Sequence, residues 1–394
     1  MALSLQLPTA SGALAAYTLR GSAPVKPAPG VQFNRIAYSA AHVVADPLAA
    51  IDPWLQCAID WDTTIAYRQR LWSLGLGVAE AMDTAQRGMG LDWPTSLELI
   101  RRSLDAARDV PGALVASGCG TDHLVLENVK TVDEVIAGYE EQMAAIEKLG
   151  GKLIVMASRA LARVAKGPAD YERVYDRVLS QAKQPVVLHW LGDMFDPALA
   201  GYWGTKDLDA AMDTALGIIA AHANKVDGIK ISLLDKDKEI AMRRRLPAGV
   251  RMYTGDDFNY AELIAGDGVG SEPTHGKSDA LLGIFDAIAP AAAAALGELA
   301  QGNTTRFHDI LGPTVPLSRH IFAAPTRFYK TGVVFMAWLN GHQKHFTMVG
   351  GQQSTRSLPH LAELFRLADA ANLLEQPELA VRRMKTLLAL HGVE

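Results

Sequence analysis

The stretch KVDGIKIS, Lys225–Ser232, places a lysine inside a pattern that is typical of a buried strand. Val226, Ile229 and Ile231 are β-branched residues, which favour strands. The nearly continuous apolar run indicates a strand covered on both faces, as the strands of parallel sheets are. Lys230 therefore stands near the carboxyl end of a buried strand, where a charged ammonium group is costly.

Further runs with strand character lie on both sides of this stretch, and long helical patterns separate them. These runs are RIAYSAA from Arg35, GVAEAM from Gly77, GALVASG from Gly112, KLIVMAS from Lys152, PVVLHW from Pro185, VRMYTG from Val250 and GVGSEP from Gly268. Strands that alternate with helices predict parallel pairing through right-handed crossovers. Eight such units over about 260 residues match the number and length of a (β/α)8 TIM barrel. A doubly wound open sheet is the alternative, but YSAAHVVAD after the first strand lacks the glycine-rich turn expected there.

The same patterns divide the chain into three predicted parts. Residues 1–33 form an N-terminal extension, in which LSLQLP and ALAAYTLRG can pair as a hairpin around TASG. Residues 34–294 hold the barrel. Residues 295–394 show helical patterns without further strands, so we expect a C-terminal helical region packed against the barrel.

Composition narrows the class of protein. Of 394 residues, 49% are hydrophobic and 21% are charged, which is typical of a soluble globular chain. The net charge of −5, with no basic cluster denser than Arg243–Arg245, does not favour nucleic-acid binding. Cys57 and Cys119 are far apart and outside any CxxC pair, so a reducing compartment is expected. The N-terminus does not resemble a Sec signal, and no apolar run suits a membrane span, so we predict a cytoplasmic protein without membrane or nucleic-acid partners.

Polar residues gather where the predicted strands end, which is where barrel enzymes place their chemistry. In chain order these residues are Glu80, Thr84 and Arg87, then Arg159, His189, Lys230, Asp256 and Asp257, and finally Glu272 and His275. The carboxyl ends of barrel strands meet at one face, so these side chains are predicted to share one site.

Lys230 is the sharpest candidate in this set. A desolvated lysine has a lowered pKa, and its neutral amine can attack a carbonyl group to form a Schiff base. The alternatives are a surface lysine at a strand end and a lysine that is ion-paired with Asp256 or Asp257. Arg87 and Arg159 suit an anionic substrate group, or they neutralise the acids of the rim.

A metal site is a second possibility. Carboxylates and histidines from several strands of one barrel can bind a divalent ion such as zinc or manganese. The candidate ligands are Glu80, His189, Asp256, Glu272 and His275. No short motif such as HExxH supports this alternative, and the first hypothesis requires no cofactor.

The stretch VDGIKISLLD resembles the Schiff-base strand V-x-G-I-K of the dihydrodipicolinate synthase / N-acetylneuraminate lyase superfamily. VRMYTGDDFNYAELIAGDGVGSEPTH is similar to the superfamily's strand ending in G-D-D and the helix and strand that follow. QPVVLHW stands where the superfamily has P-V-x-L-Y, and PTRFYKTGVVFMAWLNG resembles a helix near its C-terminus. The resemblance is collinear from about Arg35 to Leu374. It implies a class I aldolase fold with Lys230 as the Schiff-base residue, in a divergent and poorly characterised branch.

Two stretches depart from the superfamily's pattern. Its G-T-T-G-E loop, which binds the substrate carboxylate, is matched here by DTAQR, with Thr84 retained in kind and Arg87 in the place of glutamate. The superfamily's relay tyrosine after the fourth strand has no counterpart in IVMASRALARVAKGP, and the next tyrosine is Tyr171. His189, at the end of the preceding strand, is therefore our predicted acid/base for Lys230.

These observations lead to three hypotheses. The first is a Schiff-base lyase, aldolase or dehydratase in carbohydrate metabolism that acts on a keto acid or keto-sugar derivative. Thr84, Arg87 and Arg159 would orient this small carbonyl substrate, and Asp256, Asp257, Glu272 and His275 would bind its hydroxyl groups. The second is a metal-dependent sugar isomerase, epimerase or hydrolase, and the third is a sugar-binding barrel without catalysis. The resemblance also implies a homo-oligomer, either a dimer or a tetramer.

Overall fold

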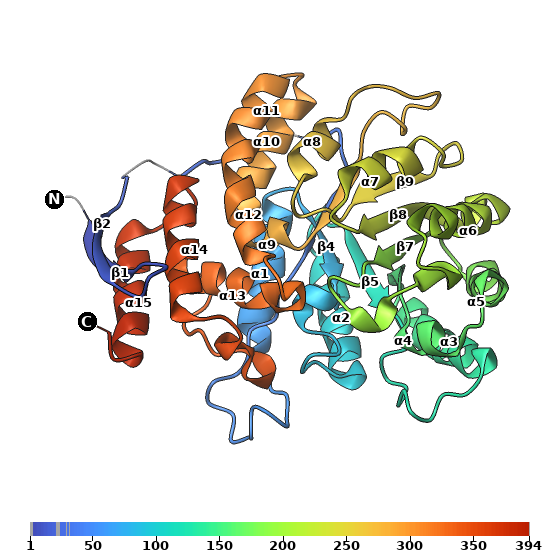
Figure 1. The fold of residues 1–394 in the computed structure, drawn as a ribbon, viewed down its shortest axis with the longest axis horizontal. Helices are drawn as coiled ribbons and strands as arrows, with labels where there is room; N and C mark the ends of the chain where they lie inside the picture. The colour runs from blue at the N-terminus through green and yellow to red at the C-terminus, as the bar shows by residue number, and fades with distance from the viewer. Residues whose placement is uncertain (1–2, 21–23, 29, 31, 394) are drawn as a thin grey trace.

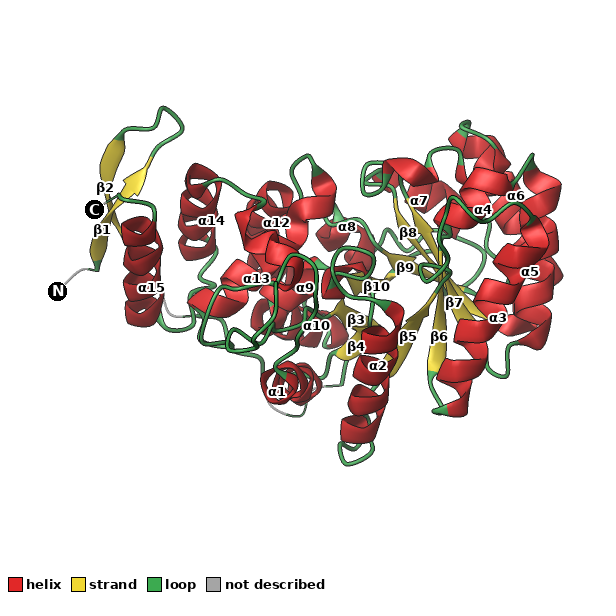
Figure 2. Cartoon of the chain, turned by 90° about the horizontal axis from the view of Figure 1, so that it is seen from below, coloured by secondary structure: helices red, strands yellow, loops and turns green. Residues whose placement is uncertain are grey.

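Parallel strands close into a barrel in the computed structural model of the protein, which describes residues 3–20, 24–28, 30 and 32–393. The strand order is β10-β3-β4-β5-β6-β7-β8-β9, and Figure 2 shows the strands converging with helices around them. The strands are β3 (Ala37–Ala40), β4 (Gly77–Glu80), β5 (Val115–Cys119), β6 (Lys152–Met156), β7 (Val186–Leu191), β8 (Val226–Ser232), β9 (Arg251–Thr254) and β10 (Asp279–Leu282). The predicted (β/α)8 barrel is confirmed.

Helices follow the strands and cover the outside of the barrel (Figure 1). They are α1 (Trp61–Ser73), α2 (Trp93–Ala107), α3 (Val132–Lys148), α4 (Arg159–Val164), α5 (Pro168–Gln181), α6 (Leu208–Ala221), α7 (Lys236–Arg243), α8 (Tyr260–Ala265), α9 (Ile284–Ala287) and α10 (Ala289–Ala300). Side-chain caps fix several starts: Asp60 accepts from the N–H of Thr63 at α1, and Thr131 and Glu134 form a capping box at α3.

The barrel interior is filled by side chains from alternate strand positions, among them Ile154, Val187 and Tyr253. Gly228 leaves room for Tyr253, because a Cβ at Gly228 would lie 2.7 Å from the tyrosine ring. In β8, Gly228 and Lys230 are two residues apart and face the same side of the sheet. Lys230 therefore points into the barrel.

The eighth strand is not the one predicted from the sequence. GVGSEP forms a loop, and β10 is the run DALL further along the chain, which pairs with β3 and β9. Gly268 has a φ of +68°, a left-handed conformation that an extended strand cannot contain. The segment that closes the barrel has no β-branched residue, so strand propensity could not reveal it.

This correction moves two predicted site residues. Glu272 and His275 precede β10, so they lie at the amino ends of the strands, opposite the predicted site. His275 bonds through Nε2 to the carbonyl of Leu246, 2.8 Å away, and its own carbonyl accepts from Arg243. The expected substrate-binding roles of Glu272 and His275 are therefore not supported.

The C-terminal region is helical, as predicted. Its helices are α11 (Thr304–Leu311), α12 (Val315–Ile321), α13 (Tyr329–Leu339), α14 (Leu358–Ala370) and α15 (Pro377–Leu390). The predicted boundary between residues 294 and 295 falls inside α10. No helix in the described part of the chain combines the length and the apolar character that crossing a membrane requires.

The predicted N-terminal hairpin is present as β1 (Ser4–Pro8) and β2 (Leu14–Thr18), paired antiparallel. It lies beside α14 and α15, at the end of the molecule away from the barrel (Figures 1 and 2). The Tyr17 hydroxyl donates to Asp369 of α14 at 2.6 Å. The rest of the predicted extension includes residues 1–2, 21–23, 29 and 31, which lie outside the described residues.

Candidate active site

Lys230 stands in a buried cavity at the carboxyl end of β8. Its neighbours in register are His189 on β7 and Tyr253 on β9, and the residue is 8% exposed. Gly255, in the sequence TGDD after β9, makes this position possible. A Cβ at Gly255 would lie 2.7 Å from Cε of Lys230, so any larger residue would collide with the lysine.

The charge of Lys230 is poorly solvated in this cavity. Burial lowers the pKa of Lys230 to about 8, and the nearby carboxylates of Asp257 and Asp83 partly oppose this change. Burial also raises the pKa of Asp257 to about 7, against the attraction of Lys230. The Asp257 carboxylate is held by the N–H of Ile284, 3.0 Å from Oδ1. Near neutral pH, part of the population can therefore carry the uncharged amine that attacks carbonyl groups.

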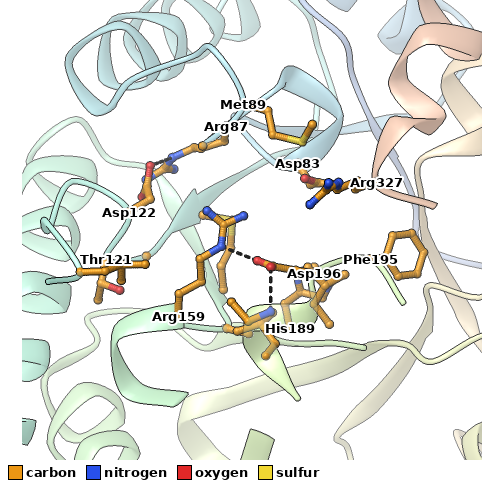
Figure 3. Close-up of a pocket in the computed structure, with 18 of the residues that line it drawn as sticks. Asp83, Arg87, Met89, Thr121, Asp122, Arg159, His189, Phe195, Asp196 and Arg327 are labelled. Atoms are coloured by element: carbon orange, nitrogen blue, oxygen red, sulfur yellow. Dashed lines mark hydrogen bonds and ion pairs between the residues drawn. The ribbon is translucent and has the colours of Figure 1, made fainter. Parts of the chain in front are cut away.

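Two adjoining cavities occupy the barrel mouth. The inner cavity has a volume of about 10 Å³, the size of one water molecule, and its polar lining includes Lys230, Asp257, Thr84 and Tyr329. The outer cavity has a volume of about 580 Å³ (Figure 3). Both are lined by Asp83, His189, Leu191 and Phe195. A ligand in the outer cavity therefore lies next to the chamber that holds the lysine.

The C-terminal helical region contributes Tyr329 to the inner cavity. Its hydroxyl lies 2.7 Å from Oγ1 of Thr84, and its ring stacks on Phe322 with centroids 4.3 Å apart. Burial raises the pKa of Tyr329 well above the usual value, with Asp83 adding to the effect, so the hydroxyl stays protonated. Thr84 thus lines the inner cavity, and its partner Tyr329 was not among the predicted residues.

The residue after Tyr329 connects the same helix to the barrel. Lys330 is fully buried, and its Nζ lies 3.0 Å from the carboxylate of Asp83 and 2.8 Å from the carbonyl of Arg327. A lysine next to a tyrosine at the start of the apolar run TGVVFMAWL was the available sequence signal. The signal could not show that the helix start packs over the barrel mouth.

His189 also lines both cavities, as expected for a residue at the end of β7. Its Nε2 lies 3.4 Å from Oγ of Ser232. Burial, and then the charge of Lys230, lower the pKa of His189 well below its usual value. The imidazole is therefore neutral at physiological pH, which makes it a weak proton carrier.

Arg87 is unavailable to a substrate, contrary to expectation. Each of its five N–H groups has a protein partner in the described structure. The partners are both oxygens of Asp122, the carbonyls of Ala81 and Gly118, and Oε1 of Gln142. Arg87 thus holds the β4 and β5 loops together.

Arg159 keeps its predicted place at the rim. Its Nε donates to Asp196, and its side chain is 40% exposed toward the outer cavity (Figure 3). Among the described residues, no protein acceptor bonds its two terminal nitrogens. These nitrogens can therefore bind a ligand.

Two other predicted acids, Asp256 and Glu80, bind protein groups outside the cavity. Asp256 accepts from the N–H groups of Phe258 and Asn259 at 2.8 and 3.0 Å, so it caps the turn after β9 and does not face the cavity. Glu80 points out of the barrel and pairs with Arg68 through two bonds of 2.9 Å. These positions do not fit the predicted roles of the two residues.

The five candidate metal ligands consequently do not come together. Glu80 lies outside the barrel, Glu272 and His275 lie at its opposite end, and Asp256 caps a turn. Within the described ranges, no three His, Cys, Asp or Glu side chains are grouped as a metal ion would require. The residues present do not fit the zinc or manganese site of the second hypothesis.

Solved structures with similar folds support the resemblance seen in the sequence. The dihydrodipicolinate synthase of Aquifex aeolicus has a TM-score of 0.63 at 12% identity, over 87% of this chain and 99% of that chain. The enzyme of the same name from Oceanobacillus iheyensis has a TM-score of 0.59 at 15% identity, over 86% and 97%. YagE, a prophage protein of the dihydrodipicolinic acid synthase family from E. coli K12 solved with pyruvate, has a TM-score of 0.61 at 13% identity, over 92% and 100%.

The chain thus shares the barrel fold of the dihydrodipicolinate synthase structures, with a buried lysine at the carboxyl end of β8. No curated protein matches the chain by sequence. The chain belongs to the family described as "Protein of unknown function (DUF993)", which matches residues 5–393.

Proposed function

We propose that the protein is a lyase or aldolase that forms a Schiff base between Lys230 and a keto acid or keto-sugar derivative. The observation that carries the proposal is the buried Lys230, with its pKa lowered to about 8, in a cavity that opens toward a pocket large enough for a small metabolite. A structurally similar protein, YagE, was solved with pyruvate, which is itself a keto acid.

The chemistry would proceed in five steps. The neutral Lys230 amine attacks the carbonyl carbon to give a carbinolamine. Loss of water then gives an iminium ion, which accepts the electron pair of a neighbouring C–C bond as that bond breaks, and the other fragment leaves as a carbonyl compound after its hydroxyl loses a proton. The resulting enamine takes up a proton, and water releases the product and the free lysine. In a dehydration the iminium ion instead accepts the pair of a neighbouring C–H bond, and the resulting enamine expels a β-hydroxyl group as water. The same lysine serves cleavage, condensation or dehydration, and no cofactor is needed.

The proton transfers require a group beside Lys230, and we assign them to Tyr329. Its hydroxyl is protonated, lies in the same cavity and is bonded to Thr84. Asp257, with its raised pKa, can take up and return a proton at neutral pH. His189 is a weaker candidate because its protonated form is disfavoured. The helical region would thus supply the hydroxyl that the fourth strand lacks.

The test is borohydride trapping with a panel of keto acids and keto-sugars, read by peptide mass. We expect a substrate-sized adduct on Lys230 in the wild type and none in Lys230→Met. Lys225→Met is a matched control, because Lys225 precedes the same strand and bonds the carbonyl of Ala182 outside both cavities. Adducts on Lys225 or Lys330 in place of Lys230 would contradict the proposal.

The same assay tests Tyr329. In Tyr329→Phe we expect the rate of adduct formation to fall about 100-fold, within the range for loss of an acid/base group. Thr84→Val should give a smaller decrease, since it removes only the partner of the hydroxyl. Equal trapping rates in the wild type and Tyr329→Phe would remove Tyr329 from the mechanism.

The proposal also includes the oligomeric state and the cellular compartment of the protein. We propose a homo-oligomer, since oligomers are common in the superfamily that this chain resembles, and sedimentation of the purified protein measures it. A cytoplasmic site of action is consistent with Cys57 and Cys119, which form no disulfide in the structure.

A further inference from the structure

Among the residues that the structure describes, one cation of the outer cavity has no carboxylate partner. Each of the three carboxylates that line this cavity is paired with a cation: Asp122 with Arg87 at 2.6 Å, Asp196 with Arg159, and Asp83 at 3.0 Å with Lys330, which lies behind the lining. Arg327 lines the same cavity, and no carboxylate in the described part of the chain pairs with it. The cavity therefore has an excess positive charge at Arg327.

The backbone fixes where this charge lies. Arg327 belongs to a short 3-10 helix, Thr326–Phe328, directly before Tyr329 and Lys330. Lys330 is bonded to the carbonyl of Arg327 and is itself anchored to Asp83. The guanidinium lies near the ring of Phe328, 5.0 Å from its centroid. The segment that brings Tyr329 to the inner cavity thus brings Arg327 to the outer one (Figure 3).

Arg159 adds donors that can act together with Arg327. Both residues line the outer cavity, and the terminal nitrogens of Arg159 have no acceptor among the described residues. Guanidinium groups favour carboxylate and phosphate oxygens, which accept two hydrogen bonds from one planar donor. Arg327 is exposed at the rim of this cavity, so a ligand anion can replace water at its guanidinium.

Lys230 lines only the inner cavity, and Arg327 lines only the outer one. We infer that the substrate is a carbonyl compound with an anionic group, carboxylate or phosphate, at the end remote from the carbonyl. Its carbonyl reaches Lys230 while the anion binds Arg327 and Arg159. This inference rests on the proposed function for the carbonyl end but depends on the outer cavity for the anionic end.

The test compares pairs of probes that differ only in the remote charge. One pair is 2-oxoglutarate and 2-oxopentanoate, which lacks the remote carboxylate, and the other is dihydroxyacetone phosphate and dihydroxyacetone. Charged and neutral refer below to the remote end of each probe. In the wild type, we expect half-maximal borohydride trapping on Lys230 at about tenfold lower concentration for the charged member of at least one pair. The pair that shows the difference identifies carboxylate or phosphate.

The decisive variant is Arg327→Gln, in which the charged and neutral probes should be trapped at the same concentration. Arg306→Gln is the matched control, because Arg306 is exposed on α11 and does not line the outer cavity. The inference is overturned if charge makes no difference in the wild type, or if Arg327→Gln keeps the full advantage of the charged probe.

A second measurement separates this inference from the proposed function. Glutarate and inorganic phosphate can be titrated calorimetrically into Lys230→Met, which cannot form a Schiff base. Binding that Arg327→Gln abolishes in this background supports the anion site even if no probe is trapped on Lys230. Absence of binding by both anions in Lys230→Met overturns the inference, whatever the trapping experiment shows.

Discussion

At the scale of single residues, the clearest feature is a lysine whose charged form is destabilised because folding buries the side chain. The pKa of Lys230 falls from the usual 10.5 to about 8 because the side chain is buried. Between pH 8 and 10.5 the unfolded chain therefore binds more protons than the folded one, and stability rises with pH in that window. Below pH 8 the cost of the buried charge is fully present. Catalytic sites commonly reduce stability in this way.

We therefore predict that Lys230→Met is more stable than the wild type at pH 7, by about 1–3 kcal/mol. Methionine fills the space without a charge, and Asp257, whose pKa is already raised, takes up a proton when its partner is lost. Urea unfolding at pH 7 and pH 10 measures the effect. The advantage of the variant should shrink at pH 10, where the wild-type lysine is uncharged.

Lys225 provides the control for this prediction. Lys225→Met should lack this pH-dependent gain, because Lys225 is half-buried and keeps a carbonyl partner. If Lys230→Met were less stable than the wild type at both pH values, the lysine would be part of a favourable ion pair with Asp257 and not a strained catalytic amine.

At the scale of elements, the space for Lys230 is created by the neighbouring strand. After β9, Gly255 contacts β8 so closely that an added Cβ would lie 2.6 Å from the carbonyl of Ile231 and 2.7 Å from Lys230 Cε. Gly255→Ala should lower the free energy of unfolding by about 1–3 kcal/mol, as overpacking does. It should also slow trapping on Lys230, because the lysine must move.

A glycine in an open position provides the comparison. Gly217 lies in α6, where an added Cβ meets no atom within 4 Å. Gly217→Ala should raise the stability by about 0.5–1 kcal/mol and leave trapping unchanged. Unaltered trapping and stability in Gly255→Ala would mean that the strands separate easily at this point.

The strands also show how much of the fold can be predicted from the sequence. Strands with β-branched runs, such as β8, were found because burial on both faces leaves a continuous apolar pattern. The strand β10 was missed because its pairing with β3 and β9, and not local propensity, makes it a strand. The error displaced Glu272 and His275 to the wrong end of the barrel.

Site prediction had a similar limit. Lys230, Thr84 and His189 could be placed near the inner cavity because each follows or ends a strand whose position was clear. Tyr329 was missed because its place depends on how a helix 245 residues away from Thr84 packs over the barrel. Arg87 and Glu80 were misassigned because the sequence near them does not indicate that Arg87 pairs with Asp122 or that Glu80 pairs with Arg68.

At the scale of the whole molecule, the barrel and the helical region share one core. A single apolar cluster includes Leu7 of the N-terminal hairpin, Leu282 of β10, Phe335 of α13 and Leu388 of α15. Polar links cross the same boundary: Thr84 to Tyr329, and Asp83 to Lys330. The inner cavity therefore exists only while the helical region is docked on the barrel.

We accordingly predict that the chain unfolds in one cooperative transition. Helix content measured by circular dichroism and the ability of Lys230 to be trapped should be lost at the same urea concentration, because docking of α13 and the cavity depend on each other. Lys330→Met should shift both curves together to lower urea, since it leaves the half-buried Asp83 beside Tyr329 without its cation. If trapping ended well before the helices melted, α13 would undock as a separate unit. Tyr329 would then act as a removable cover of the cavity and not as a fixed part of it.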